Sequence, residues 1–136
     1  LIKNSNIGKN SLAKIEKLNI KNIEKIKEKE KILKNLDKEI KKKQNVISQD
    51  EFNKEVNLLK NKINEFKIEK NKMVSEFNVF KDKELDSLFK EINPIIQNYM
   101  DKNSIEILLD RKKVFIGSIN SDLTKILINE INKNVN

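Results

Sequence analysis

The sequence predicts a mostly α-helical protein with a small β body, in which a long antiparallel helical hairpin is followed by a β-hairpin and a C-terminal helix. The 136 residues suffice for one domain at most. Charged residues make up 37% and hydrophobic residues 37%, with two glycines and one proline, which is typical of long helices that expose much of their surface. A heptad pattern in the middle of the chain and a period-two pattern near its end predict the helices and the strands.

The second half of the hairpin carries the clearest helical pattern. Its apolar residues alternate in steps of four and three, as in the seam of a coiled coil, with Lys70 filling one slot. The seam residues are Phe52, Val56, Leu59, Ile63, Phe66, Met73, Phe77 and Phe80. Leu88 lies 11 residues after Phe77, and this register slip predicts a change of partner or curvature near residues 80–88. Pro94 predicts a kink or break just before it, with the helix resuming to about Asp101.

The first half of the hairpin has a looser apolar stripe. It consists of Leu12, Ile15, Leu18, Ile26, Leu33, Leu36, Ile40 and Ile47. Ser48 followed by Glu51 has the spacing of a capping box, which indicates the start of a new helix. The hairpin is therefore expected to span residues 11–101 with its turn near residues 46–51. Residues 1–10 are expected to be the end of an N-terminal body region that is incomplete in this chain.

Residues 102–136 predict a C-terminal body of two strands and a helix. Apolar side chains alternate at period two in two short runs, and residues 110–113 between them would form the turn. Ser121 or Asp122 would cap the last helix. A lone two-stranded hairpin is marginal in water, so these strands need partners from a sheet or from other chains. The residues assigned to the core of this body or to an oligomer are Ile105, Ile107, Leu109, Val114, Ile116, Leu123 and Leu127.

The positive charge is concentrated in the first part of the chain. The formal net charge is +8, and residues 1–50 hold 14 lysines against 7 acidic residues. The candidate anion-binding residues on the first helix are Lys17, Lys21, Lys25, Lys29, Lys27, Lys31, Lys34 and Lys38. Two interpretations remain open, namely a solvated helix face and an electrostatic surface for acidic proteins, anionic lipid or lipopolysaccharide. Specific nucleic-acid binding is disfavoured, because the chain has one arginine, Arg111, and its phenylalanines lie mostly in the seam.

The residue types argue against an enzyme. The chain has no histidine and no cysteine, and its only glycines, Gly8 and Gly117, form no phosphate-binding loop. The acidic residues Asp82, Glu84 and Asp86 are typical of a solvated helix face. We therefore expect no catalytic site, no cofactor and no metal site. No apolar run approaches the ~18 residues of a membrane span, so the chain is not expected to cross a membrane.

Residues 92–133 resemble the C-terminal part of the Skp/OmpH family of periplasmic chaperones. The similar features are Pro94-Ile95, an apolar run that ends at Asp110, and the Asp122-Leu123-Thr124 opening of the last helix. The charged hairpin resembles the arm of that family, and "NSNIGK" resembles the end of its N-terminal region. This chain departs from the family in lacking the strand that precedes that region, and in having Ile116 and Gly117 where an aromatic residue is common.

The resemblance implies a homotrimer in which helical arms project from a common body. It further implies an ATP-independent holdase of the periplasm that encloses unfolded outer-membrane proteins in a cavity between the arms. The alternative is a coiled-coil adaptor or structural protein that recruits a specific helical or anionic partner. A prefoldin-like chaperone is disfavoured because its strands come between its two helices, whereas here the predicted strands follow both.

Overall fold

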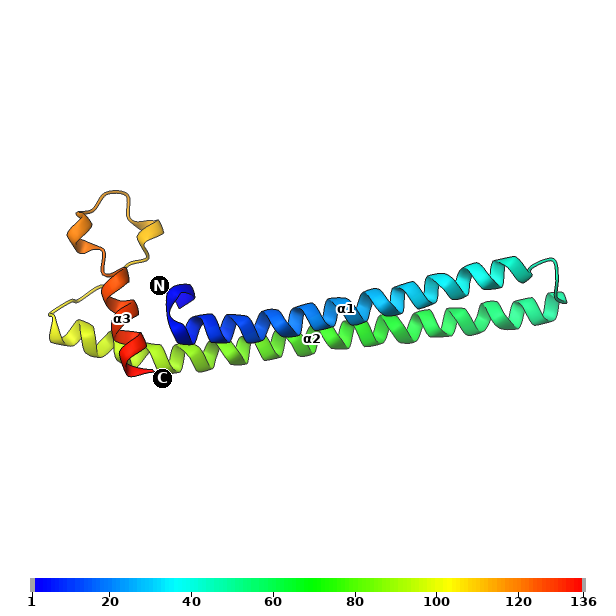
Figure 1. Ribbon diagram of the computed structural model, residues 1–136, viewed down its shortest axis with the longest axis horizontal. Helices are drawn as coiled ribbons and strands as arrows, with labels where there is room; N and C mark the ends of the chain where they lie inside the picture. The colour runs from blue at the N-terminus through cyan, green and yellow to red at the C-terminus, as the bar shows by residue number, and fades with distance from the viewer. Residues whose placement is uncertain (1, 136) are drawn as a thin grey trace. The chain divides into compact units, whose positions relative to one another are not determined.

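The structure, a computed structural model, describes residues 2–135. Three α-helices, α1 (Asn6–Lys43), α2 (Gln49–Lys102) and α3 (Thr124–Asn134), contain most of these residues (Figure 1). Three short 3-10 helices, η1 (Ile2–Asn4), η2 (Arg111–Lys113) and η3 (Ile119–Ser121), lie at the N-terminus and between α2 and α3. Residues 17–80 form one compact unit, and residues 2–16 together with 81–135 form the other. We call them the hairpin unit and the body unit.

The start of α1 is determined by a buried serine. Ser5 is fully buried, and its hydroxyl donates to the carbonyl oxygen of Ile2 over 2.9 Å. The Ser5 hydroxyl oxygen in turn accepts the N–H of Gly8 at 3.2 Å. The second bond satisfies one of the free N–H groups of the first helical turn. Gly8 is also buried, because η1 folds back onto the first turn of α1. This contact requires a residue without a Cβ at position 8.

The turn between the two long helices confirms the predicted capping box. The N–H of Ser48 donates to the Glu51 carboxylate at 3.2 Å, and the N–H of Glu51 donates to the Ser48 hydroxyl oxygen at 3.3 Å. Residues 44–48 form the connection, and α2 begins at Gln49. Two N–H groups at the helix start are thus satisfied reciprocally, which explains why α2 starts here.

The seam predicted from the heptads is confirmed within the hairpin unit. Leu59 is buried, and the other seven apolar seam residues between positions 52 and 80 are half-buried, whereas Lys70 is exposed. On α1, the members of the predicted stripe within this unit are half-buried as well. Since almost no seam residue is fully buried, the hairpin unit has a thin hydrophobic contact between two helices rather than a globular core.

The body unit contains the most deeply buried residues. Leu88 and Ile92 of α2 pack with Ile131 of α3, and each is 0–1% exposed. The half-buried residues around this cluster are Ile2, Ile7, Leu85, Ile95, Ile96 and Val135. The N–H of Asn6 donates to the side-chain oxygen of Asn132 at 2.8 Å. This bond links the start of α1 to the last turn of α3. From Leu85 onward α2 therefore has α3 as an additional partner, as the register slip predicted.

The predicted break at Pro94 is wrong, because α2 continues through this residue to Lys102. Pro94 is exposed, and so is Lys90 one turn earlier, so the carbonyl that loses its helical hydrogen bond can be solvated. The helix then ends in a Schellman motif with Ser104 at a φ of 53°. The N–H of Ile105 bonds the carbonyl of Met100 at 2.9 Å, and this closes the end of α2.

The predicted β-hairpin is also wrong, and with it the small β body, since residues 2–135 contain no strand. Residues 105–109 have no regular structure, and residues 110–114 form a local turn that joins no strands. Asp110 accepts the N–H of Lys112 on its side chain and the N–H of Lys113 on its carbonyl, at 3.0 and 2.8 Å. Period-two alternation reports which side chains share a face, but a strand needs a backbone partner, and this segment has none among the described residues.

Candidate functional site

Ion pairs connect the two helices of the hairpin unit. Lys43 lies 2.9 Å from Glu55, Lys70 lies 3.3 Å from Glu30, and Lys29 pairs with Glu69. These pairs define an antiparallel register. Each partner is at least about one-third exposed, so each pair contributes only ~0–1 kcal/mol to stability. The pairs therefore orient the two helices more than they hold them together.

Polar residues interrupt the seam in the middle of the hairpin unit. Lys70 occupies a seam position on α2, and its ion pair with Glu30 lies beside the pair between Lys29 and Glu69. Asn19 and Asn22 are half-buried on the seam side of α1. Such residues specify pairing and register at a cost in stability. The hairpin unit also exposes eight apolar residues outside the seam, namely Ile20, Ile23, Ile32, Val46, Leu58, Ile68, Val74 and Val79.

The eight lysines selected from the sequence all lie on α1 and are exposed. Lys29 is compensated by Glu69, whereas the other seven make no ion pair within 4.0 Å among the described residues. Those seven are Lys17, Lys21, Lys25, Lys27, Lys31, Lys34 and Lys38. The structure thus leaves most of this charge available to an anionic partner.

The lysines at the end of α1 behave differently. Lys41 pairs with Asp37 at 2.7 Å, and Lys42 pairs with Glu39 at 2.9 Å. The hydrogen bond from Lys42, assisted by its charge, lowers the pKa of Glu39. Because the third lysine, Lys43, pairs with Glu55, none of the three is free. Spacings of three and four residues along the helix signal the first two pairs in the sequence, but the third depends on how α2 packs.

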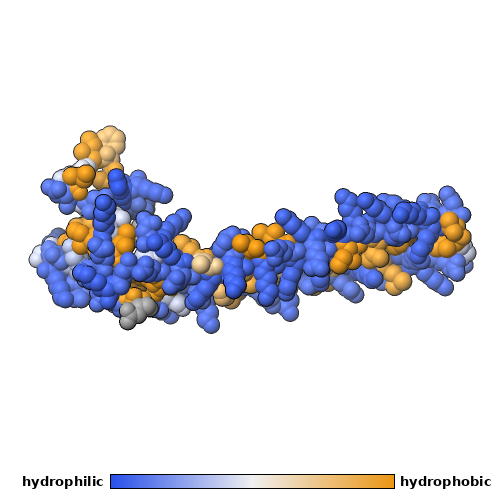
Figure 2. Space-filling view, in the orientation of Figure 1, coloured by the Kyte–Doolittle hydropathy of each residue, from blue (hydrophilic) through white to orange (hydrophobic). Residues whose placement is uncertain are grey.

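The residues assigned to a body or oligomer core have mixed surroundings in the single chain. Leu127 is buried, and Leu123 and Ile105 are half-buried. Ile107, Leu109, Val114 and Ile116 are exposed, and so are Phe115 and Ile119 beside them. Figure 2 shows hydrophobic side chains gathered at the end of the lobe formed by this segment, with hydrophilic ones on either side. A surface of this kind is typical of an interaction site, and its role in an assembly stays a prediction.

The predicted cap of α3 at Ser121 or Asp122 is wrong, because the N-cap is Leu123 and its side chain makes no capping bond. Asp122 nevertheless bonds the first residue of the helix. Its carboxylate oxygen accepts the N–H of Thr124 at 3.1 Å, and Arg111 lies 3.1 Å from the other oxygen. The hydrogen bonds from Thr124, with a smaller effect of the Arg111 charge, lower the pKa of Asp122. A lowered pKa in the folded state stabilises the fold at pH values above the ordinary carboxyl pKa, and this contribution is lost as the pH falls through the lowered value.

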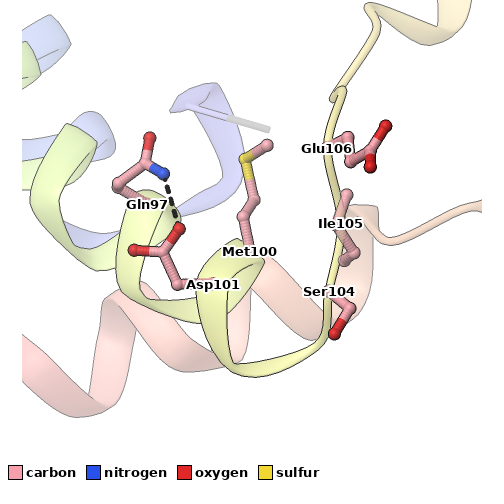
Figure 3. A pocket seen from close by; sticks show the side chains of 6 residues that line it. All are labelled: Gln97, Met100, Asp101, Ser104, Ile105 and Glu106. Carbon is pink, nitrogen blue, oxygen red and sulfur yellow. Dashed lines mark hydrogen bonds between the residues drawn. The ribbon is translucent and has the colours of Figure 1, made fainter.

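Two hollows occur where ligands could lie. An open hollow of about 580 Å³ at the end of α2 is lined by Gln97, Met100, Asp101, Ser104, Ile105 and Glu106. Figure 3 shows the amide of Gln97 directed toward Asp101, to which it donates at 2.8 Å.

The second hollow is an apolar groove of about 180 Å³ near the turn of the hairpin unit, which sequence analysis did not predict. It is lined by Leu36, Glu39, Ile40, Lys43, Glu55, Leu58, Leu59 and Lys62. We call it the tip groove. Consecutive leucines at positions 58 and 59 on a heptad helix are the only sequence signal for it, because one of them must lie outside the seam.

Within residues 2–135, no three acidic side chains are grouped so that they could hold a metal ion. None of the helices in this part of the chain has a stretch long and apolar enough to cross a membrane.

Comparisons with known proteins agree with this architecture. The OmpH family, described as "Outer membrane protein (OmpH-like)", matches residues 1–131. A solved structure from Caulobacter crescentus CB15, described as a candidate outer membrane chaperone (OmpH-like), aligns with a TM-score of 0.85 at 21% identity. The alignment covers 98% of this chain and 79% of the other. No curated protein sequence matches. The family match extends over almost the whole chain and confirms the resemblance inferred from the sequence, so the chain belongs to the Skp/OmpH family.

Proposed function

We propose that this protein is an ATP-independent holdase of the periplasm that binds unfolded outer-membrane proteins and prevents their aggregation. Membership of the Skp/OmpH family supports a general chaperone role, and it supports the expectation that the protein is not an enzyme. The holdase activity, the compartment and the clients go beyond that membership and are part of the proposal.

The observation that carries the proposal is the surface of the hairpin unit. Seven lysines without an ion pair lie on the same unit as eight exposed apolar side chains, and the seam between the helices is interrupted by polar residues. An unfolded chain offers dispersed apolar and charged groups, so many weak contacts of both kinds would hold it. Many such contacts together would keep the client bound. Because each contact is weak by itself, the client could still dissociate without ATP.

Removing positive charge from α1 should weaken this holding. Replacing Lys17, Lys21 and Lys25 together with glutamine removes three charges that have no partner, and we expect roughly threefold to tenfold more protein to be needed to suppress aggregation of an acidic unfolded outer-membrane protein. The measurement is light scattering by the diluted client, at low and at moderate salt, since salt should reduce the wild-type effect.

The control for charge alone is the replacement of Lys54, Lys60 and Lys67 on α2 with glutamine. These lysines are also exposed, but α2 holds ten lysines against eleven acidic residues and so has no excess of positive charge. We therefore expect a smaller effect. If both triple variants and the wild type suppress aggregation equally at both salts, the basic face of α1 is only a solvated surface. If suppression is confined to one client among several unrelated unfolded proteins, the alternative function as a specific adaptor is favoured.

We further propose that three chains associate through residues 105–119. The exposed residues of this segment include Ile107, Phe115, Ile116 and Ile119, with exposures of 72%, 97%, 83% and 87%. Replacing Ile107 with aspartate should abolish the association, because a charge that becomes buried without a partner costs several kcal/mol. Light scattering should give three chain masses for the wild type and one for this variant.

The matched control is Ile68→Asp, which places the same charge at a similarly exposed residue of the hairpin unit, where exposure is 70%. Ile68→Asp should retain the mass of three chains. A wild-type mass of one chain at micromolar concentration would contradict the proposed association.

A further inference from the structure

We propose that the tip groove binds one large apolar side chain of an unfolded polypeptide, preferably phenylalanine or leucine, at a point where the next side chain is a carboxylate. This inference rests on the proposed function, because it identifies the feature of a client that the hairpin unit recognises. The apolar lining of the tip groove comes from Leu36, Ile40, Leu58 and Leu59, and its charged lining comes from Glu39, Lys43, Glu55 and Lys62.

The size of the groove limits its ligands. Its volume of about 180 Å³ is smaller than the ~300–1,000 Å³ of most small-molecule sites. An apolar cavity of ~150 Å³ accepts a benzene molecule, so this groove has room for one aromatic ring or one branched aliphatic side chain. Because the groove is open to solvent, the backbone of the bound polypeptide can continue past it in both directions.

The two adjacent leucines explain why the groove is apolar and unfilled. Leu59 occupies a seam position and is 7% exposed, so it forms part of the floor. Leu58 precedes it outside the seam and is 60% exposed, so its side chain forms a wall of the groove that is largely open to solvent. An apolar side chain placed between Leu58 and Ile40 would remove this surface from water, and that is the main source of the expected affinity.

The charges around the groove favour an acidic neighbour for the bound side chain. Lys43 is compensated by Glu55 at 2.9 Å, and Glu39 is compensated by Lys42 at 2.9 Å. Lys62 makes no ion pair within 4.0 Å in residues 2–135. The one uncompensated charge of the lining is therefore positive, which complements a carboxylate and repels an ammonium group.

The test uses the full chain and short Gly/Ser peptides that carry a central Phe-Asp, Ala-Asp or Phe-Lys pair. Binding is followed by the shifts of leucine methyl signals in NMR spectra as peptide is added. We expect the Phe-Asp peptide to reach half-saturation at a concentration about tenfold lower than the Ala-Asp peptide. The Phe-Lys peptide should bind more weakly than Phe-Asp, and Lys62→Gln should remove the difference between those two.

A pair of protein variants separates the groove from the rest of the surface. Leu58→Gln should weaken binding of the Phe-Asp peptide about fivefold, since it replaces one wall of the groove with a polar side chain. Ile68→Gln changes an equally exposed residue of α2 outside the groove and should leave binding unchanged. Both positions are exposed, so both variants should keep the helical circular dichroism of the wild type.

The outcomes distinguish the groove from the holdase proposal. Equal binding of the Phe-Asp and Ala-Asp peptides, or equal effects of Leu58→Gln and Ile68→Gln, would overturn the groove as the binding site even if the wild type suppresses client aggregation. If the wild type suppresses no aggregation but the peptide and variant pattern holds, the groove remains a peptide site and the holdase proposal fails.

Discussion

Replacing Ile92 with alanine should lower the free energy of unfolding by about 2–5 kcal/mol, the range for truncating a fully buried isoleucine. Ile92 is 0% exposed and packs with Leu88 and Ile131 at the centre of the body unit. Few other residues of the chain are buried to this extent, so little packing remains to compensate for the cavity. Urea unfolding monitored by helical circular dichroism measures the change, provided that the slope of the transition stays constant.

The control for this prediction is Ile107→Ala, measured below the concentration at which chains associate. Ile107 is 72% exposed in the single chain, so its truncation should change the free energy of unfolding by less than about 0.5 kcal/mol. Hydrogen exchange should show the loss of protection for Ile92→Ala in residues 81–100 and 124–131, which pack around the cavity. Equal unfolding midpoints for the two variants would contradict the assignment of the core to the body unit.

Gly8→Ala should destabilise the protein by roughly 2 kcal/mol, although alanine is the better helix former by ~1 kcal/mol. A Cβ at position 8 would lie 1.9 Å from the carbonyl oxygen of Ile2 and 2.8 Å from its carbonyl carbon. Backbone atoms cannot yield as a flexible side chain would, so η1 must leave the helix. The two hydrogen bonds of Ser5, at ~1 kcal/mol each, and the packing of the half-buried Ile2 would be lost, which outweighs the gain in helix propensity.

Gly117→Ala is the matched control, because the only contact of a Cβ there is with a Val114 side-chain carbon at 3.4 Å. We expect its free energy of unfolding to stay within about 0.5 kcal/mol of the wild type. Thermal unfolding compares the two variants, and hydrogen exchange of the amides at positions 5 and 8 reports whether η1 has detached. A Gly8→Ala variant at least as stable as the wild type would show that η1 does not pack as described.

The two long helices and their seam follow from local patterns in the sequence. Heptad spacing between Phe52 and Phe80, and the capping box of Ser48 and Glu51, are local patterns in which each residue interacts with neighbours three or four positions away. Such interactions depend on the helix alone, so they are readable before the tertiary structure is known. The excess of lysine on α1 was also predictable, because net charge depends on the residue types alone and not on the fold.

Features that depend on residues far apart in the chain follow from tertiary packing and could not be predicted from local patterns. The segment with Ile105, Ile107 and Leu109 alternates like a strand, but no other strand pairs with it among the described residues. The chain after it forms local hydrogen bonds to Asp110 instead. Lys29 was assigned to an anion-binding face, yet α2 brings Glu69 beside it and neutralises it. The tip groove likewise exists only where α1 and α2 meet. In each case the contact that matters joins residues far apart in the sequence. Whether it forms depends on the free energy of packing and not on the helix or strand propensity of either residue.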